Sequence, residues 1–138
     1  MSTAGHRLAC AVLLVVLAAG CGEGGLGLSA GPSGASLEGM WSGWFSSITT
    51  GTRTTRATLF QVGSVVTGFW TFFYMNGTIS GDLTGSVVGS TVLLTMRPTS
   101  SSGCSLSVVG SIRNDRLEGS WSTTDCDTRD VGTFSLTR

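Results

Sequence analysis

The sequence predicts an all-β protein, a single antiparallel up-and-down meander of about eight strands that closes into a small barrel. Three observations predict this fold class. Beyond residue 37, Val, Ile, Thr, Phe and Trp alternate with polar residues at a period of two, as in half-buried strands. Gly, Asn, Asp and Ser interrupt these runs at short intervals, which is typical of tight turns. Eight sequential strands can close on themselves and thereby remove both exposed edges of the sheet.

The alternation gives each strand an expected position. In residues 79–87, apolar residues and glycines share one face, while polar residues occupy the other. Turn signals at Gly63-Ser64, Asn76-Gly77 and Asn114-Asp115 separate neighbouring strands. We therefore expect strands at 38–46, 55–62, 65–74, 78–87, 91–97, 105–113, 116–123 and 130–137.

A weak internal repeat, apolar–x–Gly–x–apolar, recurs along these strands. It occurs at 37–41, 66–70, 79–83, 108–112 and 117–121. The glycine falls on the same face as the large residues, although glycine weakens a strand. This alternation of small and large residues predicts an inner barrel face on which a bulky side chain lies over the glycine of the neighbouring strand. Glycine also permits the sharp coiling that closure of a barrel needs.

The N-terminal region carries a targeting signal. Arg7 precedes twelve apolar residues, 8–19, which as a helix would span only about 18 Å of a hydrocarbon core of roughly 30 Å. This length behind a basic start is typical of a signal peptide rather than a membrane span. The small residues at 18–20 lead directly into Cys21. This stretch resembles the signal peptide and lipobox of bacterial lipoproteins.

The lipoprotein resemblance implies a domain order and a location. Residues 1–20 would be the removed signal peptide, and the thiol of Cys21 would carry the lipid. Residues 21–36, mostly Gly, Ser and Ala, would form a flexible tether, which leaves 37–138 as the barrel domain. The protein would be extracytoplasmic and anchored to the cell membrane, on the periplasmic side of the outer membrane where the cell has two membranes. The alternative is an ordinary secretory signal with a chance cysteine at the cleavage site.

The remaining cysteines predict a disulfide. Cys10 would leave with the signal peptide, so only Cys104 and Cys126 stay in the barrel domain, in a non-cytosolic compartment. In the chain-entropy model, a disulfide that closes a loop of about 22 residues stabilises the folded protein by roughly 3 kcal/mol. A metal-bound or catalytic thiol pair is the weaker interpretation, because neither CxxC spacing nor a histidine accompanies them.

Both ends of the predicted domain resemble avidin-like and lipocalin-like barrels. The opening Leu37-Glu38-Gly39-Met40-Trp41 is similar to the first strand of both families, and residues 132–138 are similar to their closing strand. The resemblance implies a lipocalin/avidin-like barrel architecture. It implies no particular ligand, because function lies in sites rather than in folds.

Composition excludes several kinds of chemistry. The one histidine, His6, lies in the predicted signal peptide, and the chain has no lysine. The mature protein would therefore lack a Ser–His–Asp triad, a Cys–His pair, a histidine zinc site and Schiff-base chemistry. Net charge is zero and no basic run exists, so the sequence offers no basic surface of the kind that binds nucleic acid. We expect a non-enzymatic protein with no cofactor and no metal.

Acidic residues offer two further candidate sites that we consider weak. Glu38 and Glu118 alternate with the apolar face and should point into solvent rather than form a catalytic pair. Asp125, Asp127 and Asp130 are spaced like the start of a calcium loop, but the glycine and terminal glutamate of that loop are missing. A solvated polar loop beside the disulfide is favoured.

Tryptophans on the predicted inner face suggest a ligand site. Trp41, Trp70 and Trp121 either fill the core or form a stacking wall for an apolar or ring-shaped ligand. A domain of about 100 residues favours the filled interior. The sequence thus predicts a binding module of the cell envelope whose ligand would be small and apolar.

An outward set of aromatics suggests an alternative function. Strand 65–74 is aromatic on both faces, so Phe69 and Phe73 would point out, with Trp44 nearby. An exposed apolar patch would suit a partner protein, a dimer or a membrane contact. The barrel would then be a packed structural domain that contacts other envelope proteins. A bulge or a different register near Phe72 would explain the same pattern without a patch.

Overall fold

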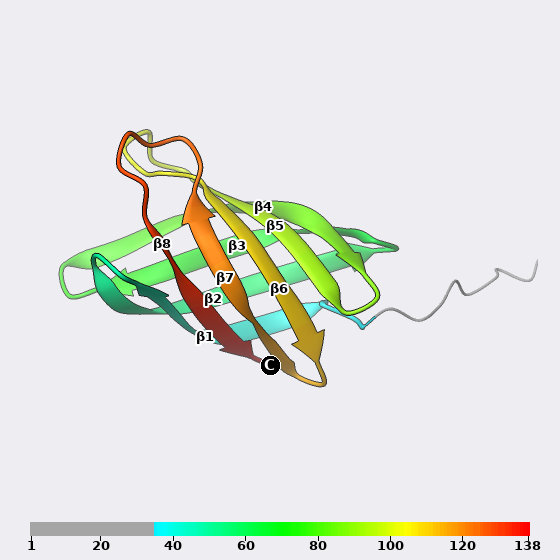
Figure 1. Cartoon of the computed structure of the whole chain (residues 1–138). Helices are drawn as coiled ribbons and strands as arrows, with labels where there is room; N and C mark the ends of the chain where they lie inside the picture. Colours follow the sequence, from blue (N-terminus) through cyan, green and yellow to red (C-terminus); the bar gives the residue numbers. More distant parts are fainter. Residues whose placement is uncertain (1–34) are drawn as a thin grey trace, which may run out of the picture.

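The computed structural model describes residues 35–138. The predicted signal peptide, Cys21 and most of the predicted tether lie outside the described residues. Eight strands run in chain order: β1 Gly39–Ser47, β2 Gly51–Val62, β3 Val65–Tyr74, β4 Gly77–Val88, β5 Thr91–Pro98, β6 Leu106–Arg113, β7 Arg116–Thr123 and β8 Val131–Thr137. Each pairs antiparallel with the next, and β8 pairs with β1, so the sheet closes into a barrel (Figure 1). The predicted fold class is confirmed. Residues 35–138 contain no helix of the length and apolarity that crossing a membrane requires.

Most strands begin and end within one residue of the expected positions. The exception is β2, which begins at Gly51, four residues before the predicted start. The added segment contains no aliphatic residue, so alternation of apolar side chains could not reveal it. Its backbone nevertheless pairs with β1, which places Arg53 opposite Phe45. This extension contributes an arginine to the interior of one barrel end.

The turns between strands follow the glycine and asparagine signals, with one difference. Gly63-Ser64 and Asn114-Asp115 form two-residue turns as predicted, and Asn114 adopts the left-handed conformation with a φ of 54°. At the β3–β4 turn, Tyr74 pairs with Gly77, so the two loop residues are 75 and 76 rather than Asn76-Gly77. Gly77 is the position with positive φ there, at 148°.

The glycines of the inner face allow neighbouring strands to approach closely. Trp70 pairs with Gly81 and Trp121 pairs with Gly132, so each indole has a residue without a side chain as its cross-strand neighbour. A Cβ added at Gly81 would collide with the backbone of β5, and one at Gly132 with the backbone of β1. The predicted alternation of small and large residues is therefore confirmed as a feature of close strand packing.

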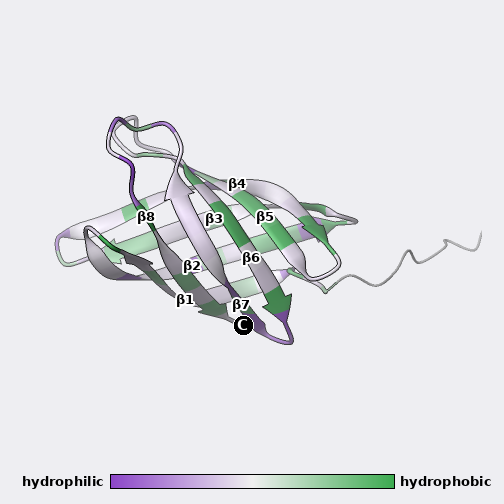
Figure 2. Cartoon of the chain, viewed as in Figure 1, coloured by the Kyte–Doolittle hydropathy of each residue, from purple (hydrophilic) through white to green (hydrophobic). Residues whose placement is uncertain are grey.

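The middle of the barrel is filled by side chains. Apolar side chains alternate with polar ones along the strands (Figure 2), and the apolar set points inward. Only about 10 Å³ of empty space remains at the centre, too little for a water molecule. The core there consists of Ala57, Leu59, Leu83, Leu94, Met96, Val108, Leu117, Phe134 and Leu136.

The end of the barrel at which the described chain begins is sealed. Leu37 is fully buried, and its carbonyl oxygen accepts a 2.8 Å hydrogen bond from Nε1 of Trp41. The guanidinium of Arg138 lies 5.1 Å from the centre of the Trp41 ring and also donates to Asp115 at 2.8 Å. Because the C-terminal arginine holds the β6–β7 turn and the ring together, little room remains for a ligand at this end.

Candidate ligand-binding cavity

A cavity lies at the opposite end of the barrel, beneath the loops that follow β1, β3, β5 and β7. Its volume is about 280 Å³, at the lower limit of small-molecule pockets. Figure 1 shows the two longer of these loops, residues 99–105 and 124–130, side by side at this end, while the chain enters at the other. The barrel is thus filled at its centre, sealed at one end and hollow at the other. The filled interior is confirmed for the centre of the barrel, and the ligand site at the open end stays a prediction.

Four aromatic rings form a continuous wall of the cavity. Trp70 and Phe72 of β3 have ring centres 4.7 Å apart, and Phe72 lies 5.0 Å from Phe45 of β1. Phe45 in turn lies 6.3 Å from Trp121 of β7. Each side chain is at least nine-tenths buried. Tilted rings at these separations give an apolar surface suited to a ring-shaped ligand.

The polar groups of the cavity lie near its mouth. The guanidinium of Arg53 stands 4.7 Å from the centre of the Tyr74 ring, a cation–π contact. The carboxylate of Asp130 accepts hydrogen bonds from the hydroxyl of Ser47 at 2.7 and 2.8 Å, and from the amide of Val131 at 2.9 Å. The site thus combines an apolar wall with a few polar groups that could orient a ligand.

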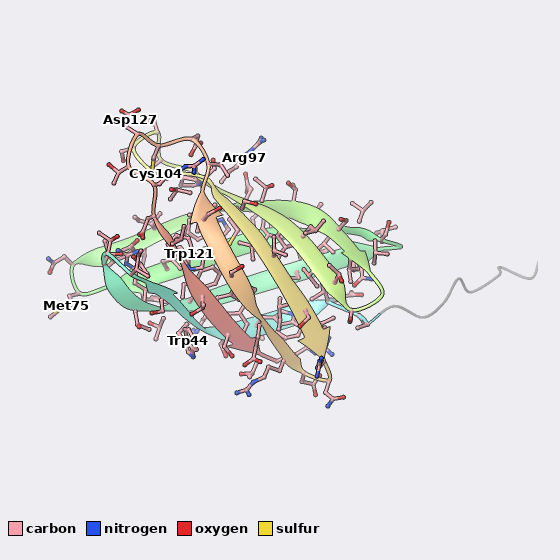
Figure 3. The ribbon with its side chains drawn as sticks, viewed as in Figure 1. Trp44, Met75, Arg97, Cys104, Trp121 and Asp127 are labelled. Carbon is pink, nitrogen blue, oxygen red and sulfur yellow. A yellow bond between two sulfur atoms is a disulfide. The ribbon has the colours of Figure 1, made fainter. Side chains whose placement is uncertain are left out.

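A disulfide fixes the two longer loops. Cys104 and Cys126 form a disulfide bond, with their Cα atoms 5.6 Å apart, which confirms the predicted disulfide. Cys104 itself lines the cavity, and Figure 3 shows it below the loop that carries Asp127. The bond therefore ties the loop after β5 to the loop after β7 at the mouth.

Two acidic residues of the last loop, Asp125 and Asp130, have different hydrogen-bond partners. Asp125 accepts hydrogen bonds from the hydroxyl of Ser105, at 2.7 Å, and from its backbone amide. These two bonds favour the ionised form and hold the pKa of Asp125 below its usual value. Across residues 35–138 no three His, Cys, Asp or Glu side chains lie close enough together to hold a metal ion.

The buried tryptophans differ in what their N–H groups contact. Nε1 of Trp70 donates a 3.0 Å hydrogen bond to the carbonyl oxygen of Asp82. Nε1 of Trp121 is buried and has no partner within residues 35–138. A buried donor without an acceptor destabilises the folded protein, because the donor loses its hydrogen bond to water and gains none in return.

The structure divides the predicted ligand-binding residues between the two ends. Trp70 and Trp121 line the cavity, whereas Trp41 belongs to the sealed end. Phe45 and Arg53 also line the cavity and were not predicted from the sequence. Phe45 follows Trp41 by four residues on the same strand face, so the period of two could have identified it. Arg53 had no such signal, because the start of β2 lacks apolar alternation.

The three residues of the predicted partner patch all lie on the outer surface. Phe69 is 60 % exposed, and Trp44 and Phe73 are about two-fifths exposed. The pairing of β3 with β2 and β4 is continuous, so the strand has no bulge in this region. Thr54 stands between Trp44 and Phe73 in the pairing, and Figure 3 shows Trp44 on the outside of the barrel. Phe69 instead packs edge-on against Phe60, with ring centres 6.4 Å apart.

Comparisons with known proteins identify the fold and no family. No family model matches the chain. No curated protein matches it in sequence. Among solved structures, EF1p2_mFAP2b bound to DFHBI is similar with a TM-score of 0.65 and 13 % identity, covering 74 % of this chain and 93 % of that one. The redesigned β-barrel mFAP1 bound to DFHBI gives a TM-score of 0.61 at 15 % identity, covering 74 % and 94 %. Another redesigned β-barrel gives 0.62 at 14 % identity, covering 74 % and 90 %. These likenesses define the class as a small eight-stranded antiparallel barrel.

Proposed function

We propose that this chain is a lipid-anchored protein of the cell envelope whose barrel binds a small apolar ligand without catalysing a reaction. The observation that carries the proposal is the aromatic-walled cavity of about 280 Å³ at one end of an otherwise filled barrel. A barrel selected only for stability gains from filling such a space, because each void forfeits packing contacts. Two barrels of similar fold are bound to DFHBI, which supports a ligand-binding role for this barrel.

The position of the chain's entry point supports an anchored binding protein. The described chain begins at Ala35 beside the sealed end, opposite the loops that surround the cavity (Figure 1). A lipid on Cys21 would therefore anchor the barrel through the end that has no cavity. The mouth would remain accessible from the aqueous side of the membrane.

The absence of histidine and lysine from the predicted mature sequence supports a binding role over an enzymatic one. The cavity offers Arg53 and Asp130 as charged groups, and both carboxylate oxygens of Asp130 are engaged by Ser47. Among the residues that the structure describes, no hydroxyl of the cavity lining forms a hydrogen bond to a carboxylate that could act as its base.

A cavity-filling pair of variants tests ligand binding. Ile79→Trp adds a large side chain to the cavity wall, whereas Leu93→Trp adds the same side chain to the outer face of β5. Calorimetric titration with a panel of apolar one- and two-ring compounds should show binding to the wild type and to Leu93→Trp, and none to Ile79→Trp. A panel that never binds the wild type, while melting curves show a folded protein, contradicts the proposal.

The anchor has a separate test. Mass spectrometry of the mature N-terminus from native cells should find a diacylglyceryl group on Cys21 and no residues before it. A mature chain that carries an unmodified Cys21 thiol refutes the lipid anchor and leaves the cavity proposal standing.

Exposed aromatics on the outer face favour a second candidate function, contact with other envelope proteins. Phe69 and Phe60 are 60 % and 48 % exposed and pack on each other, so their rings form a contiguous apolar patch on the outer face. Cross-linking of the lipidated protein in cells should then capture a neighbour through β2 and β3. A strictly monomeric protein with no cross-linked neighbour argues against this function.

A further inference from the structure

The cavity contains an arginine that forms no ion pair within residues 35–138. Arg53 occupies an inward position of β2, since it shares a face with the buried Thr55 and Ala57. Its side chain is partly buried and lines the cavity. Within residues 35–138 no carboxylate lies at ion-pair distance from it, in contrast to Arg116 and Arg138. Its contact is with the face of the Tyr74 ring, and its guanidinium forms no hydrogen bond within the described part of the chain.

The one acidic group that lines the cavity does not compensate for this cation. The two oxygens of Asp130 share the hydroxyl proton of Ser47, and one of them also accepts from the amide of Val131, so the carboxylate is directed to β1 and to its own backbone. The wall also contains Trp121, whose N–H lacks an acceptor. The guanidinium of Arg53 is therefore a charged donor at the cavity that no carboxylate within residues 35–138 neutralises.

We propose that the ligand is an apolar carboxylate, with its ring or hydrocarbon body against the aromatic wall and its carboxylate held by Arg53 at the mouth. This inference rests on the proposed binding function and adds the class of ligand to it. A guanidinium presents a planar fork that matches a carboxylate with two parallel hydrogen bonds. Beside an apolar wall such a pair is less screened than in water, so it discriminates between charged and neutral ligands.

The chain offers a matched control for Arg53. Arg56 lies three residues further along the same strand and places its guanidinium 5.7 Å from the centre of the Phe73 ring. Its side chain is exposed on the outer face, and it does not line the cavity. Arg53→Gln and Arg56→Gln therefore remove the same charge from the same strand, once from inside the barrel and once from outside.

Two probes of nearly equal shape separate charge recognition from apolar binding. 2-Naphthoate carries a carboxylate at neutral pH, and 2-naphthamide carries a neutral carboxamide on the same two rings. Calorimetric titration of the folded, disulfide-bonded protein with each probe should show about tenfold tighter binding of naphthoate to the wild type. Arg53→Gln should weaken naphthoate binding about tenfold and so abolish this preference, and Arg56→Gln should retain the preference.

The outcomes distinguish the two proposals. Equal affinity of the wild type for both probes refutes the carboxylate inference and leaves apolar binding in place. A preference that survives in Arg53→Gln refutes the role of this arginine. Failure of both probes to bind a folded wild type contradicts the binding function itself. A preference of the wild type for naphthoate that weakens as salt is raised supports the ion pair, and a preference that salt does not change contradicts it.

Discussion

Replacing each buried tryptophan by phenylalanine should reveal which indole N–H groups contribute to stability. The three indoles of Trp41, Trp70 and Trp121 are between 1 % and 6 % exposed, so contraction of the ring removes a similar buried area in each case. They differ in their hydrogen bonds. Trp41 donates to Leu37 and Trp70 donates to Asp82, whereas Trp121 has no acceptor among the described residues.

The difference can be given a magnitude. Removing the donor from Trp41 or Trp70 forfeits a hydrogen bond worth about 1 kcal/mol and leaves a carbonyl oxygen without its partner. Removing the donor from Trp121 instead relieves the cost of a buried group that has no acceptor. Trp121→Phe should therefore leave the protein about 2 kcal/mol more stable than either Trp41→Phe or Trp70→Phe. For a domain of about 100 residues this corresponds to roughly 10 °C in Tm.

Urea unfolding followed by far-ultraviolet circular dichroism measures this difference without relying on tryptophan emission. Trp44→Phe, on the exposed outer face, is the control and should change stability by less than about 0.5 kcal/mol. If Trp121→Phe is as destabilising as Trp41→Phe, the indole of Trp121 has an acceptor in solution and the reasoning fails.

Three further changes test the barrel and its mouth. Gly81→Ala should cost about 3 kcal/mol in urea unfolding, because its Cβ would meet the backbone of β5, while Thr84→Ala on the outer face of the same strand should cost under about 0.5 kcal/mol. Replacing both Cys104 and Cys126 by serine should lower the free energy of unfolding by roughly 3 kcal/mol and weaken ligand binding at the mouth; a wild type whose stability does not respond to reducing agent contradicts this. An NMR titration should find the pKa of Asp125 below its usual value of 3.8, because Ser105 donates two hydrogen bonds to its carboxylate. A lowered folded-state pKa means that its contribution to stability is present above that usual value and is lost as the pH falls through the folded-state pKa, so Asp125→Asn should flatten the acid side of the stability profile.

The fold was predictable because every strand carries a local signal. Period-two alternation identified the eight strands, and the recurrent glycine predicted an inner face with close packing. Two-residue turns at Gly63 and Asn114 followed from the few residue types that tolerate positive φ. Closure of β8 on β1 was predicted from the number of strands rather than from a motif, and the pairing of Ser42 to Ser47 with residues 132–137 confirms it.

The cavity was less predictable, because its walls depend on depth along the barrel axis. Trp41, Trp70 and Trp121 share the inner face, and the sequence distinguishes faces but not levels. Only the register places Trp41 beside Arg138 at the sealed end and the other two in the lining of the cavity. Arg53 was missed for a related reason: a polar inward residue at a barrel mouth breaks the alternation that marks a strand.

Assignment of the four indole N–H resonances by NMR, followed through a titration with 2-naphthoate, tests the central claim most directly. The indoles of Trp70 and Trp121 line the cavity, while Trp41 is buried at the other end and Trp44 faces solvent. We predict saturable shifts of the Trp70 and Trp121 signals with little change at Trp41 and Trp44. Shifts confined to Trp44, or no shift of any indole at a probe concentration that fills a site of millimolar affinity, would contradict a ligand-binding cavity at this end of the barrel.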